Sequence, residues 1–167
     1  MKKFKIEIKW AIVIMIIFLA WMTLEKQLGF HDEKLKWQVF FGMLIIIPNF
    51  ALYFLAIRDK KKNYYNGEMN WKQGFISGVV ISFIVVIFSP FTQFITYEFI
   101  VPNYFEKMVA LSVESKRLTE EEAKSYFNLS ASIWQNISSV LSYGIVLGAI
   151  VAYILKTKTP ILNPKTK

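Results

Sequence analysis

The residues able to do acid–base or metal chemistry lie in and beside one short segment. His31, Asp32 and Glu33 are consecutive, and Glu25 precedes them in the chain. Neighbouring imidazole and carboxylate groups can bind a metal, but a structural zinc site needs about four ligands. The chain has a single His and no Cys. We therefore expect a solvated polar loop at this place and no metal, cofactor or catalytic residue.

A membrane would give the same groups a second use. Glu25 and Glu98 stand at the ends of apolar segments, and an ionisable side chain inside a membrane is a functional candidate. We place both carboxylates at the headgroup layer, because each lies where its apolar run stops. An enzyme acting on lipid headgroups is kept as an alternative hypothesis, with the candidate residues Glu25, His31, Asp32 and Glu98.

Neutral polar residues and prolines occur inside two apolar segments. Pro48 precedes Asn49, and Pro90 precedes Gln93 by three positions. A proline removes a backbone hydrogen bond and kinks its helix, and paired broken helices can mark a transport site. Neutral polar side chains also bond between helices, at about 0.6 to 2 kcal/mol each. We expect structural contacts from these residues and keep a polar pathway as the alternative.

Small residues recur at every fourth position in two segments. The positions are Gly74, Gly78 and Ser82 in one, and Gly144, Gly148 and Ala152 in the other. Such stripes let helix backbones approach each other closely in a membrane. They predict that the two segments pack together, or that one stripe mediates a dimer.

Long apolar helices must position all of these residues. The 167-residue chain is 54% hydrophobic and only 19% charged, which excludes a disordered chain and an ordinary soluble enzyme domain. Four segments, 8–24, 37–57, 74–97 and 133–155, are long enough to cross a hydrocarbon core of about 30 Å. Their backbones must satisfy their own hydrogen bonds there, so they are helices. The predicted fold is an all-α, single-domain bundle of four transmembrane helices.

Charge predicts the orientation of the bundle. With four spans, the N-terminal tail, the 58–73 loop and the C-terminal tail share one side and hold 13 of the 20 basic residues. Basic loops stay in the cytoplasm, so we expect both termini there. The same rule accounts for the net charge of +8 without a nucleic-acid partner. The first segment resembles a signal peptide but lacks a small-residue cleavage site, so we interpret it as a retained helix.

The segment 102–132, between the last two spans, is too long for a structureless connection. Phe105, Met108, Val109 and Ser112 recur at helical spacing, and Thr119 with Glu122 forms a capping-box pattern. We predict an amphipathic helical hairpin outside the cytoplasm, turning near 116–118. Whether its second arm is continuous with the last span is left open.

Several stretches resemble a large family of small bacterial four-span membrane proteins catalogued as a domain of unknown function. They are the end of the second apolar segment at 53–61, GEMNWKQGFISG at 67–78, FIVPNYF at 99–105 and EEEA at 120–123. The resemblance covers nearly the whole chain and is most specific at 67–78. It implies a location in the bacterial inner membrane and a similar architecture, and it transfers no activity or catalytic residue.

Three functions remain open at this stage. The leading hypothesis is a non-enzymatic membrane protein that assembles with itself or with a membrane-protein partner through 102–132, besides its contact with the lipid bilayer. The second is a small transporter or channel subunit that acts as an oligomer, with a pathway near Pro48, Asn49, Pro90 and Gln93. The third is the lipid-headgroup enzyme described above.

Overall fold

The structure is a computed structural model that describes residues 4–157 of the chain. Within those residues it contains helices and turns and no strand, and four helices are long and apolar enough to cross a membrane. They are α1 (Lys5–Gln27), the run Leu35–Asn63, the run Trp71–Ile100 and α7 (Leu129–Leu155). The predicted all-α fold with four membrane helices is therefore confirmed. Each helix extends beyond its predicted apolar bounds, because polar flanking residues continue the same backbone ladder.

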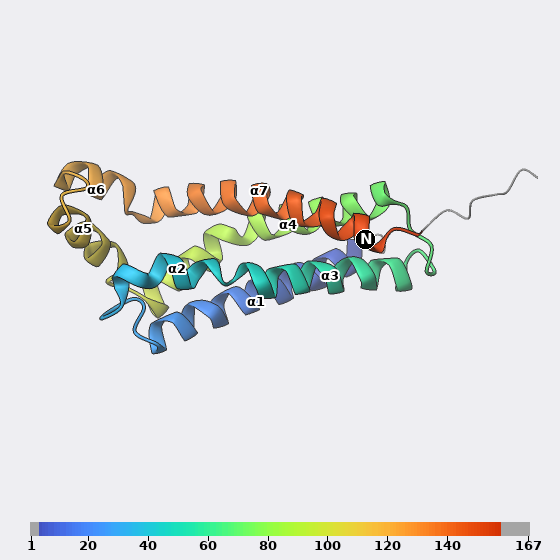
Figure 1. The fold of residues 1–167 in the computed structure, drawn as a ribbon, viewed down its shortest axis with the longest axis horizontal. Helices are drawn as coiled ribbons and strands as arrows, with labels where there is room; N and C mark the ends of the chain where they lie inside the picture. Colours follow the sequence, from blue (N-terminus) through green and yellow to red (C-terminus); the bar gives the residue numbers. More distant parts are fainter. Residues whose placement is uncertain (1–3, 158–167) are drawn as a thin grey trace, which may run out of the picture.

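The four spans run alternately up and down. Figure 1 shows the start of α1 and the end of α7 at one end of the bundle, here called the terminal end. Two short helices, α5 (Tyr104–Glu114) and α6 (Glu120–Tyr126), cap the opposite end, here called the hairpin end. This arrangement separates two sets of polar groups by the length of the apolar helices.

Proline acts differently in the two spans that contain it. The second span consists of a 3-10 turn (η2, Leu35–Trp37), α2 (Gln38–Met43) and α3 (Ile46–Asn63), with Pro48 in the first turn of α3. A proline is tolerated there because the amide it lacks has no partner within the helix. In contrast, α4 (Trp71–Ile95) passes through Pro90 as one helix and continues into the π-helical segment η3 (Thr96–Ile100). Only the first proline lies beside an interruption of its span.

The closest packing in the bundle is between α4 and α7. A carbon added at Gly78 would lie 2.7 Å from the Cα of Gly148, and one added at Gly74 would lie 2.9 Å from the Cβ of Ala152. One helical turn further along the stripes, a carbon added at Gly144 would lie 2.3 Å from the Ser82 hydroxyl oxygen. The two small-residue stripes thus face each other within one chain, and the two backbones are nearly in contact.

Local capping explains where the connecting helices begin. The Asn70 side chain accepts a hydrogen bond from the backbone amide of Gln73, and the Gln73 side chain accepts one from the backbone amide of Asn70. This capping box begins α4 within the 67–78 motif. Thr119 and Glu122 form the predicted capping box of α6. The chain leaves α6 at Phe127, and the Asn128 side chain caps α7. The second arm of the hairpin is therefore not continuous with the last span.

Candidate functional site

A buried ion pair lies at the terminal end of the bundle. Lys60 Nζ lies 2.9 Å and 3.0 Å from the two carboxylate oxygens of Glu7, and the Ser77 hydroxyl donates to the same carboxylate at 2.8 Å. The side chains of Glu7 and Lys60 are only 2% and 3% exposed. The three residues come from α1, α3 and α4, so the pair fastens three spans together.

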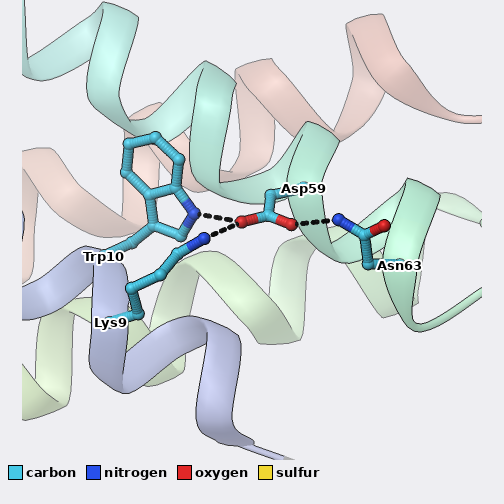
Figure 2. Close-up of polar contacts among 4 residues, drawn as sticks. All are labelled: Lys9, Trp10, Asp59 and Asn63. Carbon is cyan, nitrogen blue, oxygen red and sulfur yellow. Dashed lines mark hydrogen bonds and ion pairs between the residues drawn. The ribbon is translucent and has the colours of Figure 1, made fainter.

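A second polar cluster lies beside it and joins α1 to α3. Figure 2 shows the carboxylate of Asp59 accepting hydrogen bonds from the Trp10 indole at 2.7 Å and from the Asn63 amide at 2.6 Å, with Lys9 paired to the same group. Lys9 and Trp10 of α1 thus both bind the same carboxylate of α3. Both clusters are fully paired, which favours a role in fastening helices over a role in chemistry.

Glu25 lies inside the hairpin end of the bundle. It is 1% exposed, so its carboxylate is covered by neighbouring side chains, and its expected depth at the headgroup layer stays a prediction. Its carboxylate accepts hydrogen bonds from the Trp21 indole at 2.6 Å and from the Gln38 amide at 3.1 Å. These donors, from α1 and α2, supply the hydrogen bonds that water would give to an exposed carboxylate.

His31 is also buried, at 2% exposure, which corrects the expected solvated loop. Its Nε2 lies 3.1 Å from the Glu25 carboxylate, although the ring is not aligned for a hydrogen bond, and its Nδ1 has no partner within residues 4–157. The ring stands edge-on to Tyr104 of α5, with centroids 5.4 Å apart. Asp32 and Glu33 are exposed, as expected for a loop.

Lys107 of α5 completes the attachment of the hairpin to this loop. It pairs with the Asp32 carboxylate and lies 3.5 Å from the His31 carbonyl oxygen. The hydrogen bond from Lys107 holds the pKa of Asp32 below its ordinary value of 3.8, while burial raises the pKa of Tyr104. Charge and aromatic packing therefore both hold α5 against the first inter-helix loop.

The Asp32–Lys107 pair gives a prediction about pH. Since folding lowers the pKa of Asp32, the stabilisation is complete above pH 3.8 and is lost as the pH falls below it through the lowered pKa. Both side chains are partly exposed, so the effect is about 0.2 to 1 kcal/mol and weakens with salt. We expect Asp32→Asn to lower the free energy of unfolding by that amount at pH 7 and by less at pH 3, measured by denaturation in detergent. An equal effect at both pH values would contradict this assignment.

The remaining candidate residues, Glu98, Gln93 and Asn49, lie apart from the cluster of Glu25, His31 and Asp32. Glu98 is exposed and makes no polar contact within the described residues, so it stands apart from Glu25, His31 and Asp32. Gln93 is buried and accepts a hydrogen bond from Ser132 at 3.3 Å. Asn49 is buried at the middle of its span and lines a cavity.

The hairpin carries a large open groove. A groove of about 620 Å³ lies between α5 and α6, and its floor is apolar. The apolar lining residues are Phe105, Val109, Ala110, Val113 and Phe127. The charged lining residues are Glu106, Glu114, Glu120 and Lys124, the last paired with Glu120. Apolar side chains of both arms are thus turned toward an unfilled space with an acidic rim.

Chemical candidates are few in this arrangement. Among residues 4–157 no group of three or more His, Asp or Glu side chains could hold a metal ion. The buried carboxylates Glu7 and Glu25 each have two or more partners. Both buried carboxylates therefore connect helices through their hydrogen bonds.

Sequence reasoning missed the partners of the buried charges. Lys60 entered only the count of basic residues on one side of the membrane, and its partner Glu7 is 53 positions away in the chain. The sequence did contain a signal for a buried pair, because each of the two charged residues lies within one helical turn of the end of a long apolar helix. The groove was missed because it requires the packing of α5 against α6.

Comparison with known proteins gives a family and no further relative. A family model described as "Protein of unknown function (DUF4199)" matches residues 9–157. This range includes all four stretches that carry the resemblance stated above, and the resemblance to a family of unknown function is thereby confirmed. No curated protein and no solved structure match the chain.

Proposed function

The chain belongs to the DUF4199 family, and on this premise we propose that it is a non-enzymatic assembly component of a membrane. The groove between α5 and α6 is the contact element, and its occupant is an amphipathic helical segment of a partner membrane protein. The proposal includes the orientation expected from charge, with the hairpin outside the cytoplasm of a bacterium and both termini inside.

The observation that supports this proposal is the apolar groove. Amphipathic helices recognise partners by laying an apolar face into such a groove. Val113 is 39% exposed and Ala110 is also exposed, although both line the groove. Covering these side chains would remove apolar surface from water, which is the main driving force of association.

The charge of the rim selects the kind of partner. Three carboxylates border the groove, and the single lysine there is already paired with one of them. A partner helix with Lys or Arg beside its apolar face would meet opposite charges, which increases the association rate and disfavours acidic partners. We therefore commit to an apolar, basic helical segment.

The experiment places a photoreactive amino acid at Val113 in the full-length protein and irradiates native membranes. We expect one discrete adduct, whose partner peptide is apolar and basic. Val109→Lys within the groove should reduce the adduct at least about tenfold. Lys116→Glu, in the turn and outside the groove lining, serves as the charge-changing control and should leave it unchanged.

Three results would overturn the proposal. Adducts with lipid alone would mean that the groove rests on the bilayer. An adduct between two copies of the chain would replace the partner by a homodimer. A protein adduct that survives Val109→Lys would show that the groove does not make the contact.

A second candidate function, transport by an oligomer, is favoured by the interruption of the second span at 44–45 and the cavity beside Asn49. Interrupted helices at the middle of a membrane can frame a substrate site. Purified protein in vesicles should then pass uncharged solutes faster than empty vesicles do. Equal rates would contradict transport without affecting the assembly proposal.

A further inference from the structure

The bundle contains a partly open cavity of about 180 Å³ at the middle of all four spans. Its walls come from α1, α4 and α7, together with Ile45 and Asn49 of the second span. Polar lining residues are Asn49, Thr92, Asn136 and Tyr143, and the other lining residues are apolar. None of the described residues that line it carries a charge.

Several hydrogen-bonding groups here are unused. Within residues 4–157 no hydrogen bond is made by the side chains of Asn49, Asn136 or Tyr143, whereas Thr92 donates to the Ser89 carbonyl oxygen. Ser89 lies on the same face of α4 as the lining residues Val85 and Thr92, and its buried hydroxyl has no partner. Two amides and one hydroxyl of the lining, from Asn49, Asn136 and Tyr143, are therefore without partners, and the Ser89 hydroxyl is a further unpaired group on the same face of α4.

Unpaired polar groups are costly at this depth. The hydrocarbon layer has no water to supply the missing hydrogen bonds, and an unsatisfied amide or hydroxyl is destabilising even in a protein interior. The three such groups that line the cavity are therefore expected to have a partner when the protein is in its membrane.

The side chains that line the cavity indicate which kind of ligand fits it. An acyl chain would fill the space but leave the amides unpaired, and an ion would lack a charged ligand. The volume resembles that of an apolar cavity of about 150 Å³ that holds benzene. Phe18 and Tyr143 offer ring faces, while Asn49 and Asn136 offer amide donors and acceptors.

We propose that this cavity binds an uncharged, lipid-soluble molecule whose head is a single ring carrying a hydrogen-bonding oxygen, as in a phenol. The ring packs against the apolar wall, and its oxygen bonds to Asn136 and Tyr143 of α7. This site is independent of the groove in the hairpin, so each can be tested without the other.

The test measures binding of 4-fluorophenol and of fluorobenzene to the purified full-length protein in detergent, by fluorine NMR titration. The two probes differ in the hydroxyl group and match in the ring. We expect saturable binding of 4-fluorophenol about three- to tenfold tighter than that of fluorobenzene, which is the effect of about one net hydrogen bond. Partition into the micelles is not saturable and is recorded with empty micelles.

Two variants and a control locate the binding. Asn136→Leu and Tyr143→Phe should each reduce or abolish the preference for 4-fluorophenol while fluorobenzene still binds. Tyr143→Phe removes one oxygen and keeps the ring, so it preserves the fold. Gln135→Leu, an exposed neighbour on α7, should change nothing.

The proposal is overturned by any of three results. They are the absence of saturable binding of 4-fluorophenol to folded protein, equal affinity for both probes, and a preference that persists in both Asn136→Leu and Tyr143→Phe.

Discussion

Replacing Lys60 by Met is expected to lower the free energy of unfolding by about 3 to 5 kcal/mol. The change leaves the Glu7 carboxylate, 2% exposed, without its cationic partner inside the bundle, and breaking a buried ion pair has a cost of this size. Only the Ser77 hydrogen bond remains to the carboxylate within the described residues. The measurement is reversible denaturation in detergent, monitored by helical circular dichroism.

Two further variants separate charge from packing. Lys62→Met changes an exposed lysine of the same helix and should have an effect below about 0.5 kcal/mol. The double variant Glu7→Leu/Lys60→Met should recover most of the loss, since replacing both members of a buried pair by apolar groups is often neutral. If Lys60→Met costs no more than Lys62→Met, the ion pair does not fasten these helices.

Replacing Gly78 by Val is expected to cost about 3 kcal/mol, at the upper end of the range for over-packed cores. Even the first added carbon would lie 2.7 Å from the Cα of Gly148, and a backbone cannot move aside as a flexible side chain can. The helices α4 and α7 must therefore separate. The expected readout is a lower denaturation midpoint and faster hydrogen exchange along both helices.

The matched control for this prediction is Ala20→Val. Ala20 is exposed on the surface of α1, so the same kind of added bulk would meet lipid or detergent and change stability little. A Gly78→Val protein as stable as the Ala20→Val protein would show that α4 and α7 are not in close contact.

The spans could be predicted from the sequence because length and apolar content are local properties. The capping box at Thr119 was predictable for the same reason, since its partner Glu122 is three positions away. The spacing of the glycine stripes was visible as well, but the sequence left open whether they meet within one chain. That depends on which helices are neighbours in space.

The burial of His31 shows the limit of such reasoning. Its neighbours Asp32 and Glu33 are polar and exposed, and the pattern correctly indicates a loop. The ring is nevertheless covered, because Tyr104 and Lys107 come from a helix more than seventy positions later. The groove between α5 and α6 depends on the same kind of distant packing, so its apolar lining could be recognised as amphipathic but not as an open surface.

The charge-based orientation and the assembly proposal can be examined together, because the chain has no cysteine of its own. A single cysteine introduced into the hairpin is therefore the only thiol that a labelling reagent can modify in this chain. Tyr126 is 54% exposed and does not line the groove, whereas Val113 is 39% exposed and does. A membrane-impermeant maleimide added to intact cells would label whichever of them is accessible from outside.

This labelling is the most direct measurement of the central claim, that the hairpin groove is an occupied contact surface outside the cytoplasm. The account predicts that Tyr126→Cys is labelled in intact cells, while Val113→Cys is protected there and becomes labelled once the protein is purified in detergent. Equal labelling of both in intact cells would show an empty groove. Labelling of neither before lysis would place the hairpin on the cytoplasmic side and contradict the account.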